Sequence, residues 1–244
     1  MLRAVSAAGE IWVGLLTTGV AAAVGGVSGF LLRRARDKVP ARALWRLTAP
    51  ETLSIYIARS FVEDTGKYLR EGTGIGQLRA LSVISPSLQR AYGRIDQNVR
   101  LSSDSVGVTL EGDVISLGGG KNNRVTIELL EELRRRYSNV PISAASALKW
   151  FDGARDRERT AETQAGIIVK DYGLIVAGEN PCCVNRRAIV LAGASTYGTI
   201  AAARYFVGQG LKSRKAAFAI VSAKVLDGHV HEPTLEYESE LDPV

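Results

Sequence analysis

Residues 113–126, with the sequence DVISLGGGKNNRVT, contain the pattern that decides the fold. An apolar strand is expected at 113–117, followed by three glycines, a polar turn and a helix that starts at 125. Residues 187–208 repeat this arrangement, with an apolar strand at 187–192, the turn AGASTYGT and a helix of mostly small residues. Continuous apolar strands that lead into helices predict an α/β fold whose sheet is covered on both faces.

The rest of the pattern agrees with this interpretation. Further strands are expected at 52–58 and 216–226, a hairpin over 165–177 with its turn at 170–173, and a helix at 76–92 that Pro86 interrupts. We therefore expect a three-layer Rossmann-like or flavodoxin-like fold with a mainly parallel sheet and one added hairpin. Residues 94–112 and 138–164 have no clear pattern.

The candidate ligand site follows from this topology, because open α/β sheets bind ligands at the carboxyl ends of their strands. Glycine lets the backbone approach a ligand, and the amides at a helix N-terminus favour an anion. The same turns also need glycine and capping residues for purely geometric reasons, so a structural role remains an alternative. The candidate ligand-binding residues are Gly74, Gly76, Gly118, Gly119, Asn122, Asn123, Thr126, Gly193, Ser195, Thr196, Gly198 and Thr199.

Several kinds of chemistry are disfavoured by the sequence. It contains no G-x-x-x-x-G-K-[ST] motif, and no G-x-G-x-x-G follows a predicted strand, so the common nucleotide-binding signatures are absent. The chain has only two histidines, which excludes a multi-histidine metal centre, and no metal site is expected. Glu63 and Asp64 form an acidic pair that could act in general acid–base catalysis. The sequence otherwise identifies no catalytic residue and no cofactor.

One resemblance supports the fold prediction. The run 113–126, the segment DYGLIV at 171–176, Asn180-Pro181 and the turn within 191–199 resemble an uncharacterised group of bacterial Rossmann-like α/β proteins. Members of that group carry turns of the forms GGPxxNxxT and AGxxxxGT. This chain has Gly120 where the group often has proline. The resemblance covers about residues 50–226 and implies a Rossmann-like fold and ligand sensing, but it supplies no catalytic residue.

The net charge of +6 is concentrated at the N-terminal end. Residues 1–46 contain seven basic and two acidic side chains, which leaves a net charge of only +1 for the rest of the chain. A nucleic-acid-binding domain would spread its cations over a folded surface, so no nucleic-acid partner is expected. The basic block follows Ile11 to Leu32, a run of 22 uncharged residues.

This run predicts a membrane anchor. A helix of that length spans about 33 Å, which is enough to cross a bilayer core of about 30 Å. The basic residues Arg33, Arg34 and Arg36 follow it, and the positive-inside rule then places the C-terminal domain in the cytoplasm. A cleaved signal peptide ending near Ala23 is the alternative. Small residues on one helix face suggest a homo-oligomer formed through this helix, with membrane lipid as the other partner.

The predicted organisation has five parts: a short segment at 1–10, a transmembrane helix at 11–32, a basic juxtamembrane linker at 33–47, a Rossmann-like domain at 48–231 and an acidic tail at 232–244. The predicted function is a single-pass cell-membrane protein whose domain binds a nucleotide-like or phosphorylated metabolite, as a sensor or effector. Two alternatives remain open. One is a nucleotide or N-glycoside hydrolase that uses a loop carboxylate, and the other is a membrane scaffold without a ligand.

Overall fold

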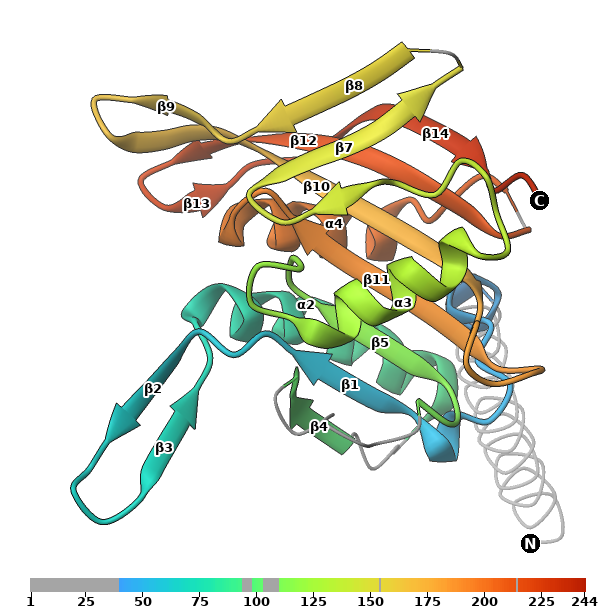
Figure 1. Cartoon of the computed structure of the whole chain (residues 1–244), viewed down its shortest axis with the longest axis horizontal. Coiled ribbons are helices and arrows are strands. Elements are labelled where there is room, and N and C mark those ends of the chain that lie inside the picture. The colour runs from blue at the N-terminus through green and yellow to red at the C-terminus, as the bar shows by residue number, and fades with distance from the viewer. Residues whose placement is uncertain (1–39, 94–97, 103–109, 154, 214) are drawn as a thin grey trace, which may run out of the picture.

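The computed structural model describes residues 40–93, 98–102, 110–153, 155–213 and 215–244 (Figure 1). Residues 40–45 are helical, and Pro50–Thr52 form a 3-10 turn, η1. The longer helices are α2 (Ile75–Tyr92), α3 (Arg124–Arg134) and α4 (Thr196–Gly208). The strands are β1 (Ser54–Ile57), β2 (Phe61–Asp64), β3 (Leu69–Gly72), β4 (Asn98–Leu101), β5 (Val114–Leu117), β6 (Ser143–Ala144), β7 (Ala147–Asp152), β8 (Arg155–Thr160), β9 (Glu162–Gln164), β10 (Ile167–Glu179), β11 (Arg187–Gly193), β12 (Ala217–Leu226), β13 (His229–Val230) and β14 (Thr234–Glu240).

The main sheet is mixed. Its nine strands follow the order β13-β12-β10-β11-β5-β1-β4, with β14 also paired to β12 and β9 to β10. The strands β4, β1, β5 and β11 form a parallel block. In contrast, β10, β12 and β14 pair antiparallel with their neighbours. The prediction of a mainly parallel Rossmann-like or flavodoxin-like sheet is therefore wrong, although the predicted helices and apolar strands lie close to where the sequence placed them.

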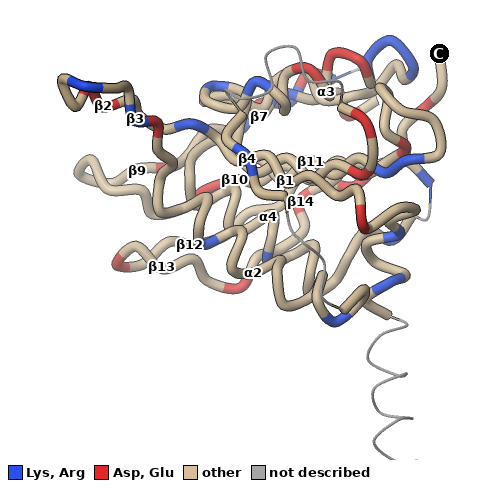
Figure 2. The backbone as a smooth tube through the Cα atoms, turned by 90° about the horizontal axis from the view of Figure 1, so that it is seen from below, with Lys and Arg blue, Asp and Glu red and all other residues tan. Residues whose placement is uncertain are grey.

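Two apolar cores lie on opposite faces of this sheet. On one face, α2 and α4 pack side by side and bury Ile84, Leu88 and Phe206. On the other face, α3 buries Leu129 and Leu133, and the small antiparallel sheet β6-β7-β8 buries Leu148 and Trp150. Figure 1 shows α3 and β7 on the near side of the sheet, with α2 and α4 behind it. Basic and acidic residues are interspersed along the described chain in Figure 2 rather than gathered in one region.

The segment predicted to be a juxtamembrane linker packs on the domain where it is described. Trp45 is fully buried, its indole nitrogen donates a hydrogen bond to Ser87 Oγ at 3.0 Å, and its ring meets Phe206 edge-on. Arg42 Nε donates to the carbonyl oxygen of Ala91 at 2.7 Å. Residues 40–47 therefore belong to the core around α2 and α4.

The predicted acidic tail is also part of the sheet. β14 pairs with β12 over most of its length, and Leu241 is buried just beyond it. The ring of Tyr237 packs between Phe218 and Trp150, which joins β14 to the core under β7. Residues 232–244 are a docked strand and its extension rather than a loose tail.

The predicted hairpin is displaced. β10 runs unbroken through residues 170–173, where a turn was expected. The actual turn joins β9 to β10 at Ala165 and Gly166, whose φ angles of 49° and 79° lie in the left-handed region.

None of the helices in the described part of the chain has the length and apolarity needed to cross a bilayer. The expected fold of one transmembrane helix before a parallel α/β domain is therefore corrected to a mixed α/β domain, and the transmembrane, single-pass assignment is withdrawn. The run 11–32, on which that assignment and the predicted oligomer rest, lies outside the described residues.

Candidate functional site

The carboxyl ends of three parallel strands are aligned in register. Ile57 of β1 pairs with Leu117 of β5, and Leu117 pairs with Leu191 of β11. β1 and β5 end at this level and β11 ends at Gly193, two residues beyond it, so the three turns that follow these strands meet at one edge of the sheet. The N-termini of α2, α3 and α4 lie at the same edge. α3 follows the turn after β5, α4 follows the turn after β11, and α2 follows the β2–β3 hairpin that comes after β1.

A small cavity of about 210 Å³ opens between these turns. Its walls come from the turn after β5, the turn after β11, and the first turns of α2 and α4. Half of the residues predicted from the sequence as ligand-binding line it, although they come from turns more than 70 residues apart. These are Gly119, Asn122, Gly193, Ser195, Thr196 and Thr199.

The other predicted residues have structural positions. Asn123 lines a second, larger cavity, whereas Gly74, Gly76, Gly118, Thr126 and Gly198 line neither. A Cβ built on Gly76 would lie 1.6 Å from Thr196 Cγ2, and one on Gly198 would lie 2.0 Å from the carbonyl oxygen of Tyr172. These two glycines therefore allow α2, α4 and β10 to pack closely, which is a different role from contact with a ligand.

Asn123 and Thr126 hold the turn itself together. Asn123 is the N-cap of α3: its Oδ1 accepts from the amide of Thr126, and its Nδ2 donates to the carbonyl oxygen of Leu117 at 2.9 Å. The Thr126 hydroxyl donates to the carbonyl oxygen of Gly118 and meets Ser116 Oγ at 2.8 Å. Because both side chains are fully buried and bonded, they fix the start of α3 against the end of β5.

Asp171 is a buried acid that sequence reasoning did not select. It lies inside β10, and its Oδ2 accepts hydrogen bonds from the Ser195 hydroxyl and from the amide of Gly198 in the first turn of α4. Burial raises the pKa of Asp171 above its ordinary value of 3.8, and the donors from Ser195, Tyr172 and Gly198 partly oppose that rise. The sequence signal is a single carboxylate within an apolar run, but the pattern predicts a turn at 170–173, where an acid is ordinary.

Two buried polar atoms at the small cavity have no hydrogen-bond partner among the described residues. They are Oε1 of Gln77, in the first turn of α2, and Oγ1 of Thr199, in α4. The exposed fraction is 7% for Gln77 and 0% for Thr199, so neither side chain has open access to bulk water. An unsatisfied buried polar group destabilises a fold by about 1–3 kcal/mol, so each of these two atoms calls for an explanation.

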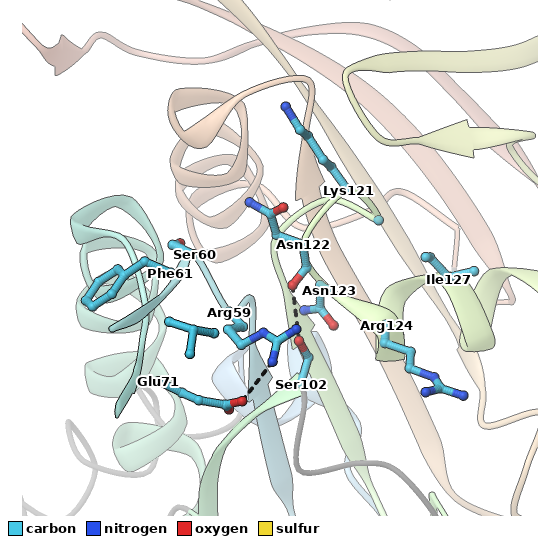
Figure 3. A pocket seen from close by; sticks show the side chains of 12 residues that line it. Arg59, Ser60, Phe61, Glu71, Ser102, Lys121, Asn122, Asn123, Arg124 and Ile127 are labelled. Carbon is cyan, nitrogen blue, oxygen red and sulfur yellow. Dashed lines mark hydrogen bonds and ion pairs between the residues drawn. The ribbon is translucent and has the colours of Figure 1, made fainter. Parts of the chain in front are cut away.

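A larger cavity of about 550 Å³ adjoins the small one through Lys121 and Asn122, which line both. Its lining includes Arg59 just after β1, Lys121 from the turn after β5, and Arg124 from the start of α3, and Figure 3 shows the Lys121 and Arg124 side chains extending in different directions. Arg59 forms an ion pair with Glu71 of β3 at 2.7 Å. Within the described structure, Lys121 and Arg124 form no ion pair, so the cavity carries excess positive charge.

These three cations were missed because basic residues in turns are usually solvated surface groups. Lys121 and Arg124 flank the Asn122-Asn123 pair, and only the topology shows that Arg59 lies at the same edge. The volume of the large cavity falls in the range typical of ligand sites, whereas the small cavity has room for one part of a ligand.

The other chemical candidates lie elsewhere. Glu63 and Asp64 are on the exposed strand β2 and do not line either cavity. Cys182 and Cys183 are free thiols on the loop between β10 and β11. No group of three or more histidine, cysteine, aspartate or glutamate side chains suited to a metal ion occurs among the described residues.

The fold and site together define a mixed α/β protein with an adjoining pair of polar cavities at the carboxyl edge of its parallel strands. Comparison with models of known protein families finds no match, and comparison with curated protein sequences finds none either. Because one fold can host many activities, a function has to be inferred from the geometry and chemistry of the site.

Proposed function

We propose that the protein binds a nucleotide-like or phosphorylated metabolite in the two adjoining cavities, as a sensor or effector. The observation that carries the proposal is the pair of buried, unpartnered atoms, Gln77 Oε1 and Thr199 Oγ1, at a cavity formed by three separate turns. A fold without a ligand would gain stability by replacing these groups with apolar ones. Their position at the carboxyl edge of a parallel block matches the usual ligand site of α/β sheets.

The charge of the large cavity supports an anionic ligand. Arg59, Lys121 and Arg124 border it, and Glu71 is the only carboxylate among the described residues that line either cavity. Arginine and lysine bind phosphoryl groups through charge-assisted hydrogen bonds, which are about twice as strong as neutral ones. A phosphorylated compound therefore suits this lining better than a neutral or cationic one.

The same lining favours binding over hydrolysis. No histidine or cysteine lines either cavity in the described structure, and Glu71 is already paired with Arg59. The acids first considered for a hydrolase, Glu63 and Asp64, are exposed on β2. A general base needs to lie within hydrogen-bond reach of the reacting group, and neither of these two acids lines either cavity.

The test is to identify small molecules retained by the purified full-length protein, using mass spectrometry after denaturation. We expect a phosphorylated compound from the wild type and from Lys212→Gln, an exposed control beyond the opposite end of α4. Lys121→Gln should retain less of the same compound. The proposal fails if no compound is retained and no nucleotide or sugar phosphate raises the melting temperature of the wild type.

A further inference from the structure

The two cavities are lined by different kinds of side chains, and this difference indicates which part of the ligand each cavity binds. We infer that the large cavity holds the phosphoryl group and the small cavity holds a neutral, hydroxyl-bearing group, so that the ligand is a phosphate ester of a sugar or of a ribose-containing nucleoside. This inference rests on the proposed function and specifies the ligand class and its orientation. It reverses the expectation that the glycine-containing turn before α4 binds the anion.

The N-terminus of α4 has little left to offer an anion. The amide of Tyr197 donates to the Ser195 side chain, the amide of Gly198 donates to Asp171, and the amide of Thr199 donates to the carbonyl oxygen of Ser195. The carboxyl group of Asp171 therefore occupies the place where a phosphate would otherwise bind at a helix N-terminus. A phosphate in the small cavity would meet a helix end at which the amides of residues 197–199 are already used.

The polar groups that remain in the small cavity match a hydroxyl. Gln77 Oε1 is an acceptor without a donor, and a fully ionised phosphate offers only further acceptors. A hydroxyl both donates and accepts, so it can satisfy the Gln77 amide in either orientation as well as the Thr199 hydroxyl. Ser146 and Asn122 add further polar groups to this lining, and none of the described residues that line it has an aromatic side chain to stack on a base.

The large cavity has the opposite character. Arg124 is the first residue of α3, where the helix dipole disfavours a cation, and it forms no ion pair within the described structure. A phosphoryl group bound beside it would be attracted both by its guanidinium and by the positive end of α3. Lys121 and Asn122 line both cavities, so a single small ligand can contact the two sites at once.

The experiment compares inorganic phosphate, ribose 5-phosphate and AMP as probes of the full-length protein. Dissociation constants come from the increase in melting temperature with probe concentration. Three variants separate the cavities: Arg124→Gln in the large one, Thr199→Val in the small one, and Lys212→Gln as a control that removes the same charge as Arg124→Gln. We expect ribose 5-phosphate and AMP to bind more tightly than phosphate to the wild type and to Lys212→Gln.

Arg124→Gln should weaken all three probes by about tenfold or more, because it removes a charged contact to the phosphoryl group. Thr199→Val should weaken ribose 5-phosphate and AMP by about fivefold and leave phosphate unchanged. If Thr199→Val weakens phosphate as much as ribose 5-phosphate, the phosphate lies in the small cavity and the inference is overturned while the proposed function stands. If none of the three probes binds, both are overturned.

Discussion

Gln77 and Thr199 are the residues at which stability and function conflict most clearly. Each has a buried polar atom without a partner in the described structure, yet each lies in a helix that packs on the main core. Most buried polar groups in proteins are hydrogen-bonded, so two exceptions in one cavity call for an explanation. The proposed ligand would supply it, because natural proteins keep destabilising groups where activity needs them.

Thr199→Val should therefore stabilise the ligand-free protein. The substitution keeps the shape of the side chain and removes a hydroxyl without a partner, so we expect a gain of about 1 kcal/mol and a rise in melting temperature of about 2–4 °C. Thr126→Val is the matched control, because that hydroxyl contacts both Gly118 and Ser116. It should lower stability by about 1–3 kcal/mol. Calorimetry would refute the account of Thr199 if both variants were destabilised alike.

Asp171 should make the protein less stable as the pH rises, whereas an acid whose pKa is lowered by folding has the opposite effect. Its pKa in the folded state is raised by burial above 3.8, so the folded protein holds the proton more tightly than the unfolded chain does. The stability that Asp171 contributes is therefore fully present below about pH 3.8 and is lost as the pH rises through the raised pKa.

Comparison of the wild type with Asp171→Asn should reveal this dependence. The free energy of unfolding of the wild type minus that of the variant should fall as the pH rises from about 3.8 through the raised pKa of Asp171. Urea denaturation at several pH values within that window measures the difference. A difference that grows with pH would mean that the three donors to the carboxylate outweigh its burial.

At the scale of elements, α3 depends on one capping residue. Asn123→Ala should lower the free energy of unfolding by about 1–2 kcal/mol, because it removes the cap and leaves the carbonyl oxygen of Leu117 without the Asn123 donor. The neighbouring Asn122→Ala is the control, since the Asn122 side chain is exposed and lines both cavities; Figure 3 shows it at the larger one. Its effect on stability should stay within about 0.5 kcal/mol. Chemical denaturation that gave equal effects for the two variants would contradict the assigned roles.

β14 should be required for a stable fold. Deletion of residues 232–244 removes the partner of β12 and the aromatic contacts of Tyr237, and it exposes the edge of an apolar strand. We expect a large fall in melting temperature or aggregation of the purified protein. A truncated protein whose melting temperature lay within a degree or two of the wild type would show that the strand contributes little.

The element positions could be predicted from the sequence where the pattern was apolar and periodic. β5, β11, α2 and α4 lie within a few residues of their predicted bounds, because strands that are buried on both faces and helices with apolar spacing leave a clear signal. β14 could not be predicted in this way. Its residues alternate charged and uncharged side chains and follow Pro233, so the segment looked solvated, and only its pairing with β12 shows its place.

For the whole molecule, the main error of the sequence-based prediction concerns the direction of the strands, which form a mixed rather than a mainly parallel sheet. Apolar composition indicates that a strand is covered on both faces, but it does not distinguish parallel from antiparallel pairing. β10 and β12 are equally apolar in their central parts, because α4 covers one face of these strands and β7 with Tyr237 of β14 covers the other. They nevertheless pair antiparallel. Strand order and direction depend on contacts between distant segments, which a local pattern does not record.

The candidate site was predictable in its position and less so in its chemistry. The rule that ligands bind at carboxyl ends brought the turns after β5 and β11 together, and the structure places six of the predicted residues around one cavity. The roles of Gly198 and Asp171 were not predictable, because a close helix–strand approach and a buried acid are defined by partners far away in the sequence. The partners of Asn123 are close in the sequence, but the residue type alone does not separate a helix cap from a ligand contact.

The central claim is that one phosphorylated ligand occupies both cavities, and its most direct test is a crystal structure of the full-length protein with ribose 5-phosphate. We predict density for the phosphoryl group beside Arg124 and Lys121, with a sugar hydroxyl within hydrogen-bond distance of Thr199 Oγ1 or Gln77 Oε1. Empty cavities at saturating ligand concentration, or a ligand bound at another face of the domain, would contradict the account.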